Sequence, residues 1–279
     1  MLDPIRSTAL QLRSASRAVR GRRISVRAAV GPLEERMVFV IGSPRLGTTF
    51  TAQAIGSCPG FVDLGEVAPL KAAIPELVAL DPKQAAPRVR RILTTARRLG
   101  LTGGLRSVEQ TPETAFIAPA VLLAFPRAQL VHLVRDGRDV VCSLLERGWL
   151  RADRSGTDDA GLPLGAHPRF WVEGGREAEF STASDVRRAA WAWRRYVEAA
   201  RAAGERVHEV RYESLASDHA AVARDLGRVL EIPAGALTAT LSAVHDLSVG
   251  RYREELSVEQ AGEIEAEAGA LLYELGYLQ

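Results

Sequence analysis

A glycine-flanked turn early in the chain carries residues suited to binding an anion. Residues 42–49 (GSPRLGTT) follow the apolar run 37–41 (MVFVI), and helical sequence comes after them. Backbone N–H groups at a strand-to-helix turn, with the positive end of the helix dipole behind them, bind phosphate groups. Arg45 adds a cation, and Thr48 and Thr49 add hydroxyl donors. We therefore predict a phosphate-binding turn; the alternative is a tight connection without a ligand.

The spacing of this turn is similar to the nucleotide-binding pattern G-x-x-x-x-G-K-[ST], with one departure. Thr48 stands where that pattern has the lysine that reaches the β- and γ-phosphates. An ATPase or kinase would lose its main cation there, whereas a ligand with a single 5'-phosphate and one terminal group does not need that reach. A P-loop small-molecule kinase, with residues 131–136 as a crude second nucleotide motif, is kept as the alternative enzyme.

A second strand-to-helix junction offers another cation and another hydroxyl. Arg135 follows the apolar run 129–134 (QLVHLV), and Ser143 lies two helical turns further along. A chain that folds over one face can bring both side chains to the same anion. The alternative is a surface helix whose charged residues 136–139 pair with one another in solvent.

The first turn resembles the 5'-phosphosulfate loop, P-[KR]-S-G-T-T, of sulfotransferases that use 3'-phosphoadenosine 5'-phosphosulfate (PAPS). Arg45, Gly47, Thr48 and Thr49 match this pattern, and Leu46 replaces its serine. The resemblance implies that Arg45 stabilises negative charge on the bridging oxygen during transfer, and that one hydroxyl contact is missing.

The second junction resembles the 3'-phosphate element of the same family, V-R-D-x-R-D-x-x-x-S. Arg135 and Ser143 match it, and the element lies downstream of the first loop in the expected order. The resemblance covers most of residues 37–279 and leaves residues 150–180 unmatched. It implies a PAPS-dependent sulfotransferase of the bacterial branch, with PAPS as co-substrate, 3',5'-ADP (PAP) as product and no metal. A catalytically inactive relative stays open because Leu46 and Gln110 weaken the motifs.

Two further segments are similar to elements of this family. VRYESL, around Tyr212, is similar to V-R-Y-E-x-L, in which the tyrosine contacts the adenine end; a buried core tyrosine is the alternative. SVGRYR, around Arg251, resembles S-x-G-R-W-R and implies a second cation for the 3'-phosphate. The alternative for Arg251 is a surface ion pair with Glu254 or Glu255.

Sulfuryl transfer also requires a base that accepts the proton of the acceptor. Cytosolic small-molecule sulfotransferases use the histidine of a K-T-H segment, but here that place holds residues 109–112 (EQTP). A carboxylate is therefore the better candidate. Glu66 is similar to the G-E base of tyrosylprotein sulfotransferases and is ranked first. Glu109 is similar to the E-K-[ST] glutamate of the heparan N-sulfotransferase branch, with Gln110 in place of the lysine.

The stretch 150–180 is rich in Gly, Pro and charge and shows no sustained period, so we predict an acceptor-side loop or lid. Its composition permits a small-molecule or lipid-like acceptor with a hydroxyl or amine. The aromatic residues behind this expectation are Trp149, Phe170, Trp171 and Phe180, and His167 is a candidate contact to the acceptor. His132 and His208 lie within strand-like runs and are expected to be structural.

Strand and helix signals alternate along the chain, which predicts an α/β fold. We expect a three-layer sandwich with a mainly parallel central sheet and a P-loop-like strand–loop–helix. Expected strands are 37–41, 107–108, 129–134 and 206–210; expected helices are 68–80, 87–99, 112–125, 136–147 and 184–203, with more helix towards the C-terminus.

Composition places the chain among ordinary globular proteins: 279 residues, 47% apolar and 25% charged. We expect one domain over residues 34–279. Two cysteines, Cys58 and Cys142, give no disulfide framework or metal cluster, and no long apolar run or signal-like segment occurs. A cytoplasmic location is the default expectation.

Residues 1–33 form a basic arm, with seven arginines and no acidic residue between positions 6 and 27. A flexible, solvated segment is the simpler interpretation, and peripheral contact with an anionic membrane or acceptor is the alternative. The net charge of +2 and the scarcity of aromatics near the arm argue against a nucleic-acid partner. Oligomeric state is not predicted.

Overall fold

A five-stranded, all-parallel sheet forms the centre of the protein in the computed structural model, which describes residues 36–99, 104–151, 169–244 and 248–279. The strands lie in the order β2 (Phe61–Gly65), β3 (Arg106–Glu109), β1 (Val38–Ile41), β4 (Gln129–Val134) and β5 (Val207–Arg211). Because β1 lies between β3 and β4, the carboxyl ends of these three strands meet at a topological switch point, where open α/β sheets bind ligands. The predicted parallel sheet is confirmed.

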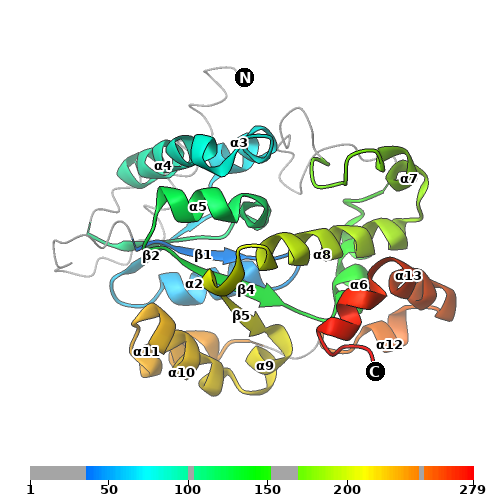
Figure 1. Ribbon diagram of the computed structural model, residues 1–279. Coiled ribbons are helices and arrows are strands. Elements are labelled where there is room, and N and C mark those ends of the chain that lie inside the picture. Colours follow the sequence, from blue (N-terminus) through cyan, green and yellow to red (C-terminus); the bar gives the residue numbers. More distant parts are fainter. Residues whose placement is uncertain (1–35, 100–103, 152–168, 245–247) are drawn as a thin grey trace.

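Helices cover both faces of the sheet, which confirms the predicted three layers. Figure 1 shows α3, α4 and α5 above the sheet and α9, α10 and α11 below it. The helices are α2 (Thr48–Gly56), α3 (Ala68–Val78), α4 (Pro82–Leu99), α5 (Ala118–Ala124), α6 (Gly137–Arg147), α7 (Glu177–Thr182), α8 (Asp185–Arg201), α9 (Tyr212–Ser217), α10 (His219–Leu230), α11 (Ala234–Leu241), α12 (Tyr252–Glu255) and α13 (Val258–Glu274), with 3₁₀ turns η2 (Pro112–Ile117) and η3 (Gly204–Arg206). None of the helices in the described ranges combines the length and apolar character needed to cross a bilayer.

Strand β1 supplies side chains to two separate hydrophobic cores. Val38 and Val40 pack with α2, α8, α10 and α11, whereas Phe39 and Ile41 pack with α3, α4 and α5 on the opposite face. Successive side chains of a strand point to opposite faces, so a strand covered on both sides must be apolar throughout. This explains the uninterrupted apolar run that precedes the phosphate-binding turn.

Two helix boundaries near prolines differ from the sequence prediction. The predicted helix 112–125 is a 3₁₀ turn followed by α5, because Pro119 has no N–H for a helical bond and its ring crowds the carbonyl of Ala115. Helix α4 begins at Pro82 instead of 87, because the Asp81 carboxylate accepts a hydrogen bond from the N–H of Lys83 at its first turn.

The edge strand β2 was missed in the sequence. Its five residues include Asp63, whose carboxylate accepts a hydrogen bond of 2.7 Å from the N–H of Gly65, and the pairing with β3 shifts register between these two residues. The register shift and the polar side chain of Asp63 interrupt the pattern of apolar residues by which a strand is recognised in a sequence. The strand matters because it ends one residue before Glu66.

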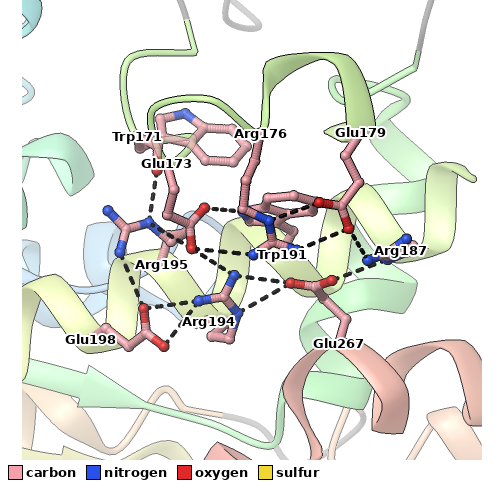
Figure 2. A network of polar contacts seen from close by, with 10 residues as sticks. All are labelled: Trp171, Glu173, Arg176, Glu179, Arg187, Trp191, Arg194, Arg195, Glu198 and Glu267. Atoms are coloured by element: carbon pink, nitrogen blue, oxygen red, sulfur yellow. Dashed lines mark hydrogen bonds and ion pairs between the residues drawn. The ribbon is translucent and has the colours of Figure 1, made fainter. Parts of the chain in front are cut away.

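The described part of the predicted lid, residues 169–180, packs against the body of the protein. Trp171 and Phe180 are buried in a cluster with Trp191 and Tyr196 of α8. Figure 2 shows how charged side chains extend this contact. The network joins residues 171–179 to α8 and α13 through Glu173, Arg176, Glu179, Arg187, Arg194, Arg195, Glu198 and Glu267. Residues 152–168, including His167, and the basic arm lie outside the described residues.

We predict that Gly137→Ala lowers the free energy of unfolding by about 1–3 kcal/mol, because overpacking costs this much. A methyl group at Gly137, in the first turn of α6, would lie 2.7 Å from the fully buried ring of Trp193. The control is Gly262→Ala within α13, where nothing lies within 4 Å of the added carbon. That variant should gain roughly 0.5–1 kcal/mol from helix propensity. Urea denaturation measures both, and equal stabilities would contradict the tight α6–α8 contact.

Candidate active site

The predicted phosphate-binding turn has an unusual backbone conformation between β1 and α2. Gly42, Arg45 and Gly47 all have positive φ angles, of 142°, 72° and 85°. A positive φ is uncommon for a residue with a side chain and recurs at ligand-binding sites. A carbon added to Gly42 would lie 2.7 Å from the carbonyl oxygen of Leu133, so the turn passes close to β4. The loop is thus fixed over the N-terminus of α2.

Arg45 joins the two predicted anion-binding motifs directly. Its Nε donates a 3.0 Å hydrogen bond to the Oγ of Ser143, a buried residue on α6. Its guanidinium also lies 5.8 Å from the ring of Trp149. The motifs are 98 residues apart in sequence, and the order of the strands brings them to one edge of the sheet.

Arg135, the first residue after β4, is held by a backbone carbonyl and by a carboxylate. Its guanidinium donates to the carbonyl of Ser248 and lies 3.5 Å from the carboxylate of Asp139. Asp139 in turn accepts hydrogen bonds from the N–H groups of Gly250, at 2.8 Å, and Tyr252, at 3.1 Å. The SVGRYR segment is therefore clamped onto the second motif, and Asp139 does not pair in solvent as the alternative interpretation required.

Tyr212 lies between the two motifs. Its ring stacks 4.8 Å from the Arg135 guanidinium, and a carbon added to Gly47 would lie 3.1 Å from that ring. Gly47 thus combines a positive φ with a close contact that a side chain would disturb. Tyr212 is buried, so it is part of the core and of the site wall at once.

Arg251 is engaged in ion pairs in this structure. Its guanidinium contacts Glu146 of α6 and, at 2.7 Å, Glu255 of α12. The predicted surface pair with Glu255 is therefore present, and Glu254 is replaced in the pairing by Glu146. Hydrogen bonds from Arg251 lower the pKa of Glu146 below its usual value. Arg251 lies beside α6, next to the second motif.

The end of β3 connects the phosphate-binding turn to Glu66. Thr49 Oγ1 donates a 3.2 Å hydrogen bond to Gln110 Oε1, and the Gln110 N–H donates to the Gly65 carbonyl at 3.2 Å. Glu66 follows directly and accepts a 2.9 Å hydrogen bond from Lys71. The side chain of Glu66 is about one-third exposed, so it can meet a ligand at this edge of the sheet.

Glu109 is fully buried and its oxygens are occupied by the protein. They accept from the N–H and hydroxyl of Thr111, from the hydroxyl of Thr114 at 3.1 Å and from the N–H of Val67 at 3.5 Å. Burial raises the pKa of Glu109 to about 8, and these hydrogen bonds lower it in part. The residue holds the turns after β2 and β3 together, and it is less suited than Glu66 to meet an acceptor.

The remaining residues of the first motif divide between core and site. Leu46 has no exposed surface and packs into the core beneath the turn, so it contributes packing in place of a hydroxyl. Thr48 is buried at the start of α2, and Thr49 is exposed.

Two histidines occupy the places in strands that the sequence predicted. His132 on β4 is fully buried 3.4 Å from Glu209, and burial lowers its pKa. His208 on β5 pairs with Asp225 at 3.0 Å. Within the described ranges, no group of three or more histidines, cysteines or carboxylates is placed to hold a metal ion.

Sequence reasoning missed four polar residues around Glu66 and the second motif: Lys71, Glu113, Asp139 and Tyr196. Asp139 entered the sequence analysis only in the alternative of solvent pairing, because its backbone partners lie more than a hundred residues away. Lys71 could have been noticed because lysine occurs at only two positions in the sequence, 71 and 83. Nothing in their spacing linked Glu113 to Tyr196.

The raised pKa of Glu109 predicts that stability falls with rising pH. In the folded protein the carboxyl of Glu109 has a pKa of about 8, whereas in the unfolded chain it titrates near 4.5. Its contribution to stability is therefore complete below pH 4.5 and is lost as the pH rises through about 8. Relative to Glu109→Gln, the free energy of unfolding of the parent should fall by about 1 kcal/mol per pH unit between roughly pH 5 and 8. Urea denaturation across this range measures it, and parallel curves for the two proteins would show that Glu109 is ionised at neutral pH.

Comparison with known proteins identifies the family. The family model described as "Sulfotransferase family" matches residues 84–235, more than half of the chain. The solved structure of sulfotransferase STF9 from Mycobacterium avium is similar with a TM-score of 0.53 and 17% identity, over 97% of this chain and 86% of that chain. A mouse sulfotransferase, SULT7A1, solved in complex with PAP, gives a TM-score of 0.48 and 15% identity over 88% and 90%.

A curated relative, an uncharacterized protein of Aquifex aeolicus (strain VF5), is 29% identical over 136 residues, 43% of this chain. The chain spans 18% of that relative's length. The family-model match includes the second anion motif and Tyr212, and the likeness to STF9 extends over the sheet that carries the first. The chain therefore belongs to the sulfotransferase family.

Proposed function

We propose that the protein transfers a sulfuryl group from PAPS to a hydroxyl or amine of a small-molecule or lipid-like acceptor. The observation that carries this proposal is the 3.0 Å contact between Arg45 and Ser143, which unites the two anion-binding motifs. One nucleotide with phosphates at both ends of its ribose would occupy the two motifs together. Its 5'-phosphosulfate would bind at residues 42–49, and its 3'-phosphate between Arg135 and Ser143.

The residues of the first motif can stabilise the departing nucleotide. In transfer, the acceptor oxygen or nitrogen bonds to sulfur while the bond from sulfur to the bridging oxygen breaks, and PAP leaves with the electron pair. The Arg45 guanidinium, and the N–H groups around Gly47, neutralise the charge that develops on that oxygen. Thr48 would donate to the 5'-phosphate, and Thr49 would do so after exchanging its hydrogen bond with Gln110 for the nucleotide.

Glu66 is the proposed base that accepts the proton of the acceptor. It lies at the carboxyl end of β2, linked to the phosphate-binding turn through Gln110 and Thr49. Its partial exposure allows contact with an acceptor, whereas Glu109 is fully buried. Geometry rather than motif likeness therefore favours Glu66 over Glu109.

Tyr212 and Arg251 complete the proposed nucleotide site. Tyr212 contacts Gly47 and Arg135, so its ring is in place to border the adenosine between the two phosphates. Arg251 would bind the 3'-phosphate after exchanging its ion pairs with Glu146 and Glu255 for the nucleotide.

An aromatic cluster near Glu66 suggests the character of the acceptor. The half-buried rings of Phe116 and Phe170 lie 5.3 Å apart, and Phe116 lies 4.8 Å from Tyr196. Tyr196 is hydrogen-bonded to Glu113, which lies 3.6 Å from the lysine that holds Glu66. An acceptor with an aromatic or apolar body fits such surroundings. Peripheral membrane contact through the basic arm and a cytoplasmic location remain predictions.

Nucleotide preference tests the proposed site against the kinase alternative. PAP should bind at least about tenfold more tightly than ADP, because Arg135 and Ser143 have no 3'-phosphate to contact in ADP. Arg135→Gln should weaken PAP binding by about 10–100-fold and leave ADP binding nearly unchanged. Arg91→Gln, on the exposed face of α4, is the matched control. Calorimetric titration measures all three proteins, and a clear preference for ADP would favour the kinase.

Replacement of the base should stop turnover without loss of donor binding. Glu66→Gln should lower kcat by at least about 100-fold, because general-base catalysis contributes this much. PAP affinity should stay nearly intact. The assay is transfer of labelled sulfate from PAPS to a panel of phenols, alcohols and amines, with Glu76→Gln on the exposed side of α3 as control. Near-normal kcat in Glu66→Gln would remove it from the role; transfer by the parent to any acceptor would exclude an inactive relative.

A further inference from the structure

Lys71 is a buried lysine in a chain that otherwise uses arginine. Lysine occurs at positions 71 and 83 alone, among 36 basic Lys and Arg residues. Lys83 is exposed on α4, whereas Lys71, in the first turn of α3, is 5% exposed. A lysine is almost never buried unless its charge is paired. The partners of Lys71 therefore indicate what it does.

Two carboxylates share the ammonium of Lys71. Its Nζ lies 2.9 Å from Glu66 Oε2 and 3.6 Å from Glu113 Oε1. The exposed fractions of the three side chains rise outward, from 4% for Glu113 through 7% for Lys71 to 34% for Glu66. The cation thus lies directly behind the proposed base, on its protein side, where the low dielectric strengthens the attraction.

Glu113 is itself held from α8. The hydroxyl of the buried Tyr196 is hydrogen-bonded to it. Burial, and then the negative charges of Glu113 and Glu66, raise the pKa of Tyr196, so the phenol stays protonated and donates. Tyr196, Glu113, Lys71 and Glu66 form a chain of contacts that ends at the edge of the sheet.

The shape of the lysine head group suits this position. An ammonium is a compact charge with three donors in different directions, so it can bridge two carboxylates from separate elements. A guanidinium is planar and wider and presents its donors as a fork. This difference accounts for a lysine at position 71.

We propose that Lys71 is a positioning residue for the base: it holds Oε2 of Glu66 so that Oε1 meets the acceptor proton. The inference rests on the proposed function, because it assigns Lys71 to act through Glu66. During transfer the acceptor proton moves to Oε1 of Glu66, and Lys71 keeps its own proton throughout. Glu113 and Tyr196 fix the lysine from behind.

Kinetics of single and double variants test this assignment. Lys71→Met should lower kcat by about 10–100-fold, because the carboxylate is left without a fixed orientation. PAP affinity should change by less than about twofold, and Lys71→Arg should recover part of the rate. Lys83→Met is the matched control and should behave as the parent. In the Glu66→Gln background, Lys71→Met should cause no further loss, because it acts through the removed carboxylate.

The outcomes distinguish a failure of Glu66 as the base from a failure of Lys71 as the residue that positions it. If Glu66→Gln retains near-normal kcat, the base assignment fails and the role of Lys71 fails with it. If Glu66→Gln lowers kcat but Lys71→Met does not, Glu66 stands as the base and the positioning role of Lys71 is overturned. The same holds if Lys71→Met lowers kcat further in the Glu66→Gln background.

Chemical labelling tests the burial and pairing of Lys71 without an acceptor. Reductive methylation with ¹³C-formaldehyde gives separate NMR signals for the two lysines. Lys83 should react at least about tenfold faster than Lys71 in the folded parent, because Lys71 is buried and held by two carboxylates, which shields its amine from the reagent. Glu113→Gln should increase the labelling of Lys71 and leave Lys83 unchanged. Equal labelling of both lysines in the parent would overturn the proposal.

Discussion

The hydrogen bond between Arg45 and Ser143 is the contact on which the architecture of the site depends. It requires β1 and β4 to lie side by side, parallel and in register, so that the turn after β1 meets the helix after β4. The pairing of Ile41 with His132 provides that register, and Gly42 provides the close approach at its end. A shift of one residue would turn the side chains of β4 to the opposite faces and separate the two motifs.

Around this contact, acidic residues organise the cations before a ligand arrives. Asp139 binds the N–H groups of the SVGRYR segment and lies beside Arg135, while Glu146 pairs with Arg251. An arginine held in one orientation loses less conformational entropy when it binds a phosphate. In the proposed site, a nucleotide would have to compete for Arg251 with two carboxylates. Arg135 is therefore already held in one orientation, whereas Arg251 would have to exchange its ion pairs for the ligand.

The strand and the turn that carry the two motifs depend on residues close together in the chain, so they could be predicted from the sequence. The run 129–134 matches β4, and residues 42–47 connect β1 to α2, which begins at Thr48. What could not be predicted depends on contacts between distant segments. β2 is a short edge strand with a register shift, and whether a glutamate after a strand is buried depends on the neighbouring strand. Motif likeness ranked Glu66 above Glu109, but the difference in their burial could not be predicted for this reason.

The difference between these two glutamates follows from one pairing. Because Gly65 lies opposite Glu109, the chain after β2 turns outward with Glu66 while the side chain of Glu109 is enclosed beneath Val67. Burial raises the pKa of Glu109 to about 8, so near neutral pH it carries a proton and adds no charge beside Glu66. The ammonium of Lys71 lies between the carboxylates of Glu66 and Glu113. A buried acid and a buried cation thus have separate parts in the proposed site: Glu109 supports the turns after β2 and β3, and Lys71 would orient the proposed base Glu66.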